Sequence, residues 1–199
     1  QAGQQRRRAG VDVAVGVVDA GQDVARLLGQ LVVGQLAQLP SFLRRRLAGD
    51  AARAAAVEAA FVAMYEQLGR ELAQLSKSKD AQERQLGLGL TRIEYENLYG
   101  ALGRALRRRV GFWGMFDALF YLLYTQSAHR DAAALCAEVL AARARYSAGQ
   151  LAGEIGVMFY LVFERLATAN LNLKEYDRAE KAYKEALEVI DGLEAVEEK

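Results

Sequence analysis

The stretch from Leu166 to Leu187 reads LATANLNLKEYDRAEKAYKEAL, and it decides the fold class that the sequence predicts. Its small and large residues stand at the offsets by which two antiparallel helices pack, with a break near Leu173. Alanines are expected where the two helices touch, and tyrosines in the gaps between this hairpin and its neighbours. The predicted packing positions are Leu166, Ala167, Tyr176, Ala179, Tyr183 and Ala186.

A weaker copy of the pattern precedes this stretch. It comprises Phe116, Leu119, Leu123, His129, Ala132, Cys136 and Leu140. The two stretches resemble tetratricopeptide repeats, a family of helical scaffolds that bind other proteins. The resemblance implies an all-α fold of antiparallel helical hairpins stacked into a tetratricopeptide-like superhelix. Apolar residues at helical spacing predict an N-terminal helical region before it. His129 corresponds to Tyr176, and this spacing of 47 residues exceeds the family's repeat of about 34, which implies longer helices or an insertion after Arg145.

A second resemblance lies in residues 94–106, where Glu94 and Asn97 precede a run of Leu and Ala at helical spacing. This pattern resembles the helix that opens the tetratricopeptide sensor of bacterial STAND-class signalling ATPases, a group that includes NLR-like proteins. There the helical sensor detects a ligand or partner and relieves inhibition of a separate nucleotide-binding module. The chain has no G-x-x-x-x-G-K-[ST] sequence, so such a module would adjoin it in a longer protein. The first residue, Gln1, also leads us to expect an excised piece.

The composition favours helices and limits the remaining possibilities. Of 199 residues, 52% are hydrophobic, and a single Pro occurs. Residues 1–110 carry 17 basic and 11 acidic side chains, whereas the rest carry 9 and 14, so a head-to-tail homo-oligomer is one hypothesis. Cys136 is the only cysteine, which excludes an internal disulfide framework and predicts a reducing compartment, the cytoplasm.

The pattern divides the chain into five segments. We expect a flexible tail (1–10), an N-terminal helical region (11–75), a hinge (76–80), a tetratricopeptide-like helical domain (81–193) and an acidic tail (194–199). The apolar run at 11–39 is interrupted by charged residues, so no membrane span is expected.

Several helices are expected within these segments. Asp50 and Asp80 are predicted to cap two long helices, which run to about Leu75 and Val110. The buried face of the first helix is predicted to comprise Val57, Phe61, Met64, Tyr65, Leu68 and Leu72, and Ile93 is placed on that of the second. The later helices are expected at 113–125, from about 131, at 148–173 and at 176–193.

The repeat register also predicts a binding surface. Side chains facing a groove between hairpins would come from two inner helices and would mix tyrosine, carboxylate and amide groups, which suits a peptide or a partner helix. The predicted residues are Asp117, Tyr121, Tyr124 and Thr125 on one helix, and Glu164, Thr168 and Asn172 on the next. The sequence therefore indicates a non-enzymatic interaction module, the sensor or scaffold part of a bacterial signalling protein.

Other chemistry is disfavoured. His129 and Cys136 would lie about 10 Å apart on one helix and lack a third residue to orient a base, so we expect no catalytic site. No E-x-x-H pair occurs, and we expect no metal and no cofactor. Three Arg triplets occur, at 6–8, 44–46 and 107–109. The alternative to protein binding is nucleic-acid binding through those at 44–46 and 107–109. The near-neutral total charge makes nucleic acid the weaker hypothesis.

Overall fold

The computed structural model describes residues 50–197, and every regular element within this range is a helix. Residues 55–199 form one compact unit, and the packing reported below is that of its described residues. The predicted tail at 1–10, residues 11–49 of the predicted N-terminal region and two of the Arg triplets lie outside the described residues. The prediction of an all-α fold is confirmed for the described part.

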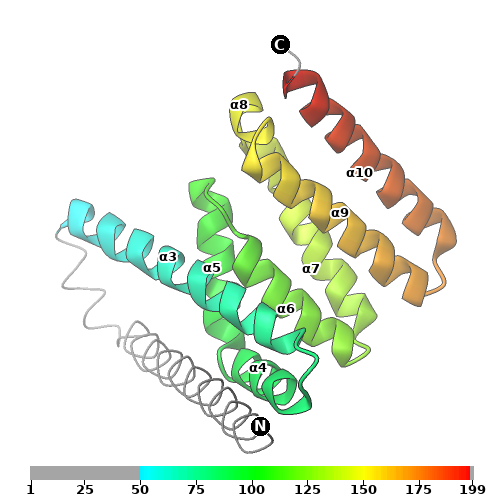
Figure 1. The fold of residues 1–199 in the computed structure, drawn as a ribbon. Helices are drawn as coiled ribbons and strands as arrows, with labels where there is room; N and C mark the ends of the chain where they lie inside the picture. The colour runs from blue at the N-terminus through cyan, green and yellow to red at the C-terminus, as the bar shows by residue number, and fades with distance from the viewer. Residues whose placement is uncertain (1–49, 198–199) are drawn as a thin grey trace, which may run out of the picture. The chain divides into compact units, whose positions relative to one another are not determined.

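The helices follow one another through short connections (Figure 1). They are α3 (Ala51–Ser76), α4 (Ala81–Ile93), α5 (Tyr95–Arg108), α6 (Trp113–Thr125), α7 (His129–Ala141), α8 (Ala148–Leu151), α9 (Glu154–Asn172) and α10 (Tyr176–Glu197), with a single 3₁₀ turn at Arg143–Arg145. α10 therefore extends into the predicted acidic tail, where it ends at Glu197.

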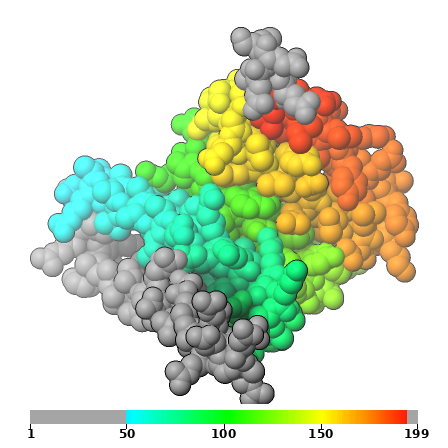
Figure 2. Space-filling view, viewed as in Figure 1, coloured from blue at the N-terminus to red at the C-terminus, as the bar shows by residue number. Residues whose placement is uncertain are grey.

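Antiparallel pairs build the C-terminal part of the fold. α6 is followed by α7, and α9 by α10, and α9 packs between α7 and α10. On the other side, α6 packs against α4 and α5. In the space-filling view α9 and α10 form one continuous surface (Figure 2). Each of these helices therefore packs mainly against helices that are close to it in the chain.

Two glycines allow α3 and α6 to approach closely. A Cβ atom on Gly69 would lie 2.5 Å from the carbonyl carbon of Gly114, and one on Gly114 would lie 2.2 Å from the carbonyl oxygen of Glu66. The Glu66 carboxylate also accepts a hydrogen bond of 3.0 Å from the Gly114 backbone N–H. The helices touch through their backbones here, and no larger residue fits at either position.

The core is centred on α6 and is rich in aromatic side chains. Phe112, Phe116 and Phe120 are fully or almost fully buried, and Phe112 packs against Phe159 of α9 with ring centroids 5.2 Å apart. Tyr65 of α3 is also fully buried. Buried phenylalanines from the start to the middle of α6 therefore form the centre of the core.

The expectation of one continuous helix from Asp80 to Val110 is wrong. Asp80 does cap α4, because its carboxylate accepts hydrogen bonds from the N–H groups of Gln82 and Glu83. The helix is interrupted at Glu94, however, whose side chain is fully buried and bonds to Tyr65 across the core. Ile93, the residue before it, turns outward and is 65% exposed, contrary to its predicted burial.

Two further expectations about the helices are corrected. The helix predicted at 148–173 is divided at Ala152 and Gly153. A capping box of Ser147 and Gln150 starts the short helix α8, and Gly153, whose backbone is extended, is the N-cap of α9. Gly156, near the start of α9, then lies so close to α8 that a Cβ there would meet the Leu151 carbonyl oxygen at 2.0 Å. Val57 is 49% exposed, since burial along the described part of α3 begins only at Val62.

The predicted hinge at 76–80 forms the connection between α3 and α4. The Ser78 hydroxyl donates a hydrogen bond of 2.6 Å to Glu83, and the Arg84 guanidinium donates one of 2.8 Å to the Ser78 carbonyl. Lys77 reaches Asp117 of α6. Hydrogen bonds to α4 and an ion pair with α6 therefore hold this connection in place.

Candidate functional site

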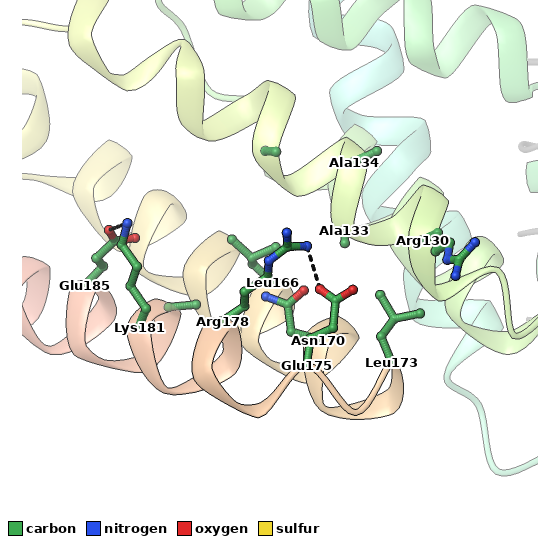
Figure 3. A pocket seen from close by; sticks show the side chains of 12 residues that line it. Arg130, Ala133, Ala134, Leu166, Asn170, Leu173, Glu175, Arg178, Lys181 and Glu185 are labelled. Atoms are coloured by element: carbon green, nitrogen blue, oxygen red, sulfur yellow. Dashed lines mark hydrogen bonds and ion pairs between the residues drawn. The ribbon is translucent and has the colours of Figure 1, made fainter.

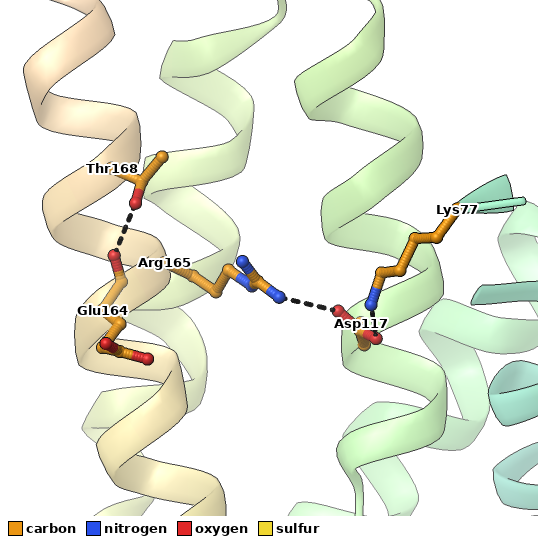
Figure 4. Close-up of polar contacts among 5 residues, drawn as sticks. All are labelled: Lys77, Asp117, Glu164, Arg165 and Thr168. Atoms are coloured by element: carbon orange, nitrogen blue, oxygen red, sulfur yellow. Dashed lines mark hydrogen bonds and ion pairs between the residues drawn. The ribbon is translucent and has the colours of Figure 1, made fainter. Parts of the chain in front are cut away.

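One predicted groove residue, Asp117 of α6, is the centre of an ion-pair network that Figure 4 shows together with Glu164 and Thr168 of α9. Asp117 of α6 is only 5% exposed, and its carboxylate binds the Lys77 ammonium group at the end of α3. The Arg165 guanidinium of α9 lies 3.5 Å from the other carboxylate oxygen, as an ion pair without a hydrogen bond. One buried carboxylate thus links α6 to residues that follow α3 and to α9.

The two cations of this network also cover aromatic rings. The Lys77 nitrogen lies 5.7 Å from the centroid of the Tyr121 ring, and the Arg165 guanidinium lies 5.5 Å from that of Phe120. Both basic side chains remain about one-third exposed. We call the surface formed by Lys77, Asp117, Tyr121, Tyr124, Glu164, Arg165 and Thr168 the inner strip.

The remaining predicted residues of α6 sit at its C-terminal end. Tyr124 is half-buried and packs against Phe120 at 5.9 Å and edge-on against His129 at 5.4 Å between ring centroids. The Thr125 hydroxyl donates to the backbone carbonyl of Tyr121, four residues earlier. Tyr121 and Tyr124 therefore keep accessible ring surface, while the Thr125 hydroxyl is already bonded.

The predicted residues of α9 are bonded within their own helix. The Thr168 hydroxyl donates to the Glu164 carbonyl at 2.9 Å, and the Asn172 amide donates to the Thr168 carbonyl at 2.8 Å. The Tyr160 hydroxyl bonds to the Glu164 carboxylate, which raises the pKa of Tyr160. Of these side chains, the Glu164 carboxylate is the one that presents a charge to the surface.

Lys77 and Arg165 are absent from the site that the sequence predicts. Lys77 falls in the predicted hinge, and Arg165 is a neighbour of Glu164 in the sequence without a motif of its own. The position of Arg165 next to the predicted residue Glu164 is the only sequence signal that points to it. No sequence pattern predicts the pairing of Lys77 with Asp117, which lies 40 residues away.

The predicted repeat-packing residues fall into two groups. Ala167, Ala179 and Ala186 are buried at the contact of α9 with α10. Tyr176 is 64% exposed, and Tyr183 is exposed as well, because within the described part of the chain no helix follows α10. The corresponding Cys136 of α7 is fully buried, since α9 packs against that helix.

A second surface, which the sequence did not predict, lies between α7 and α10 over the end of α9 (Figure 3). This groove has a volume of about 570 Å³, and we call it the outer groove. Its lining residues are Arg130, Ala133, Ala134, Ala137, Leu166, Asn170, Leu173, Glu175, Arg178, Lys181, Ala182 and Glu185. The run of alanines that leaves this space open is visible in the sequence, but alanine also fits ordinary helix packing.

The cluster around Glu94 is a buried polar site inside the fold. The Tyr65 hydroxyl and the Asn97 amide each donate a hydrogen bond of 2.7 Å to the same oxygen of the Glu94 carboxylate. Burial and the neighbouring carboxylate raise the pKa of Tyr65. The Leu and Ala residues that follow Asn97 are buried, so this pattern forms a packing face of α5.

The single thiol is fully buried, and the single imidazole is partly buried. Burial raises the pKa of Cys136 to about 12, so its thiol stays protonated near neutral pH. The His129 Nδ1 atom is buried and has no hydrogen-bond partner among the described residues. No cluster of His, Cys, Asp and Glu in residues 50–197 has the arrangement of a metal site.

The described Arg triplet is partly neutralised. Arg108 lies 3.6 Å from the Glu58 carboxylate, which Arg104 also approaches, to 3.8 Å. Arg109 ends α5 in a left-handed conformation with a φ of 57°. The triplet therefore does not form one continuous basic face.

Comparisons with known proteins give no relative. The chain matches no family model, no curated protein and no solved structure. As to membranes, none of the helices described between residues 50 and 197 combines the length and the apolar character that a spanning segment requires.

Proposed function

We propose that the chain is a non-enzymatic protein-binding module that holds a peptide or a partner helix along the inner strip. The observation that carries this proposal is the Lys77–Asp117–Arg165 network, which fixes side chains from three successive parts of the fold beside Tyr121 and Tyr124. A rigid surface with aromatic rings and charged groups is typical of residues that dominate protein interfaces.

The packing of the helices supports a tetratricopeptide-like arrangement for this module. His129 and Tyr176 begin the second helices of two successive hairpins, as their positions in the repeat pattern require. Small residues are buried where α9 meets α10, and α9 packs against the preceding hairpin through α7. In such a stack the first helices of successive hairpins form a continuous inner surface.

The chemistry of the inner strip favours a polypeptide ligand over a small molecule. Its polar groups come from α6, α9 and the residue after α3, and they are largely bonded already, so they position aromatic surface more than they enclose a pocket. Lys77 and Arg165 keep exposed N–H groups that can bind carboxylates or backbone carbonyls. We infer that the module is the cytoplasmic sensor or scaffold part of a larger, STAND-like bacterial signalling protein.

A selection followed by a binding assay tests this function. Linear peptides selected from a displayed random library on the wild-type chain would be measured against the double variant Tyr121→Ala/Tyr124→Ala and against Glu164→Lys. We expect at least tenfold weaker binding for the double variant, which corresponds to about 1.4 kcal/mol. The matched control is Tyr176→Ala/Tyr183→Ala, which removes two exposed tyrosines from α10.

The control variant distinguishes binding at the inner strip from binding at the exposed face of α10. Binding that survives in the α10 variant but not in the inner-strip variants supports the proposal, provided that all variants keep the helical circular-dichroism signal. Equal binding by the wild type and both inner-strip variants would contradict the proposed function.

A further inference from the structure

The outer groove contains a polar side chain that the fold leaves without a partner. Asn170 of α9 is only 5% exposed, and its side-chain amide forms no hydrogen bond with any residue that the structure describes. Its backbone carbonyl, in contrast, accepts a bond of 2.9 Å from the N–H of Glu175. The Asn170 amide atoms are not among the side-chain atoms that are sealed from solvent without a partner, so they open onto the groove and are accessible to a ligand there.

Figure 3 places Asn170 in the middle of the groove, beside Glu175 and Arg178. An amide side chain offers both N–H donors and a carbonyl acceptor. This is the pair of groups needed to bond the backbone of an extended peptide, which carries one donor and one acceptor per residue. The position and chemistry of Asn170 therefore suit a peptide backbone lying along the groove.

The charges of the groove identify the side chain that such a peptide would present. Two cations are already paired, Arg178 with Glu175 at 2.7 Å and Lys181 with Glu185 at 3.8 Å. Arg130 has no ion pair or hydrogen bond with any residue in the described range. It lies in the first turn of α7, a helix whose N-terminus has no side-chain cap, so the helix dipole adds to its positive field.

The lining leaves room for the ligand between these polar groups. Alanines from α7 and α10 form much of the surface, together with Leu166 and Leu173 of α9. The volume of about 570 Å³ lies within the range of about 300–1,000 Å³ that ligand pockets occupy. Short side chains along α7, together with Ala182 of α10, admit a peptide backbone, which bulkier residues there would exclude.

We propose that the outer groove binds a short acidic peptide segment. A carboxylate of the peptide pairs with Arg130, and the Asn170 side chain bonds to the peptide backbone. The carboxylate belongs either to an acidic side chain or to a peptide C-terminus, which offer the same chemistry to Arg130. This site is separate from the inner strip and does not depend on the function proposed there.

The test uses the whole chain and fluorescein-labelled hexapeptides of sequence Gly-Ala-Leu-Glu-Glu-Ala, measured by fluorescence anisotropy. One version has a free C-terminus, one is amidated, and one carries Gln in place of both Glu residues. We expect saturable binding of an acidic version that weakens as salt is raised. Loss on amidation identifies the C-terminus as the source of the carboxylate, and loss in the Gln version identifies the side chains.

Three variants connect this binding to the groove. Arg130→Gln and Asn170→Ala are each expected to weaken binding at least fivefold. Ala134 is exposed, and Ala134→Glu places a carboxylate four residues after Arg130, where it competes for the guanidinium without disturbing the core. The matched control, Arg92→Gln, removes an exposed Arg from α4 and should leave binding unchanged.

The outcomes separate this site from the inner strip. Retained binding in the Tyr121→Ala/Tyr124→Ala variant, together with loss in the Ala134→Glu variant, supports the outer groove even if the inner strip binds nothing. The proposal is overturned if no hexapeptide binds the wild type with a Kd below about 1 mM. It is equally overturned if Ala134→Glu binds as the wild type does, or if a labelled single-stranded oligonucleotide binds the groove more tightly than the peptides.

Discussion

Asp117 illustrates at the scale of one residue how this fold uses a buried charge. Its carboxylate joins Lys77 and Arg165, which come from opposite sides of α6. A buried carboxylate is tolerated because both partners are cations that remain partly exposed to water. The side chain predicted to meet a ligand therefore also holds neighbouring parts of the fold together.

We predict that Asp117→Asn lowers the free energy of unfolding by about 1–3 kcal/mol, because two cations lose their common anion while their exposure limits the cost. Urea denaturation followed by circular dichroism measures the change. Glu164→Gln, at a half-buried carboxylate of α9 that bonds to the Tyr160 hydroxyl on the same helix, should cost less than about 0.5 kcal/mol. Equal effects of the two substitutions would contradict the role given to Asp117.

The hydroxyl of Tyr65 provides a second test at this scale. Tyr65→Phe removes a buried donor from the Glu94 carboxylate, and we expect a loss of about 1–3 kcal/mol in the free energy of unfolding. Tyr99→Phe is the control, because Tyr99 bonds to Glu138 at the exposed surface, where the loss should stay below about 1 kcal/mol. A smaller effect at Tyr65 than at Tyr99 would be incompatible with a buried cluster that stabilises the fold.

At the scale of helices, backbone contact decides which glycines tolerate a side chain. Gly69→Ala forces a Cβ into the backbone of α6, and we expect it to lower the free energy of unfolding by more than about 2 kcal/mol. Gly89→Ala in α4 meets nothing within 4 Å and should raise it by about 0.5–1 kcal/mol. Thermal melts of both variants measure whether stability falls in Gly69→Ala and rises in Gly89→Ala. An unchanged stability of the Gly69→Ala variant would refute the close packing of α3 on α6.

Helices are well predicted from the sequence where local signals determine them. The Asp80 cap and the boundaries of α6 follow from residues adjacent in the chain. The break at Glu94 does not, because its cause is a hydrogen bond to Tyr65, 29 residues earlier. The same distinction applies to the candidate site. Its residues on α6 and α9 were predicted from helical spacing within the repeat. Lys77 and Arg165 were not predicted, because their contacts with Asp117 join segments that are distant in the sequence.

At the scale of the whole molecule, burial of ionisable groups predicts how stability responds to alkaline pH. Burial raises the pKa of Cys136 from 9.0 to about 12, and that of Tyr146 from 10.0 to about 12. Above pH 9 the unfolded chain therefore loses protons that the folded chain retains. The stabilisation is fully present below pH 9, and it is lost progressively as the pH rises toward 12.

Urea denaturation at intervals between about pH 8 and pH 11 measures this decline. The Cys136→Ala variant should show a shallower decline than the wild type above pH 9, since it lacks the thiol that titrates first in the unfolded state. Identical slopes for the two proteins would show that the thiol does not contribute to the pH dependence.

Binding at the inner strip depends on the whole molecule, because the strip combines Lys77, which follows α3, with residues of α6 and α9. The chain has nine tyrosines, and their ring signals in nuclear magnetic resonance spectra can be assigned with single Tyr→Phe variants. Titration of a selected peptide into the wild-type chain would then report directly which surface it contacts. We expect shifts of the Tyr121 and Tyr124 rings while Tyr176 and Tyr183 stay unchanged, and shifts confined to Tyr176 and Tyr183 would contradict binding at the inner strip.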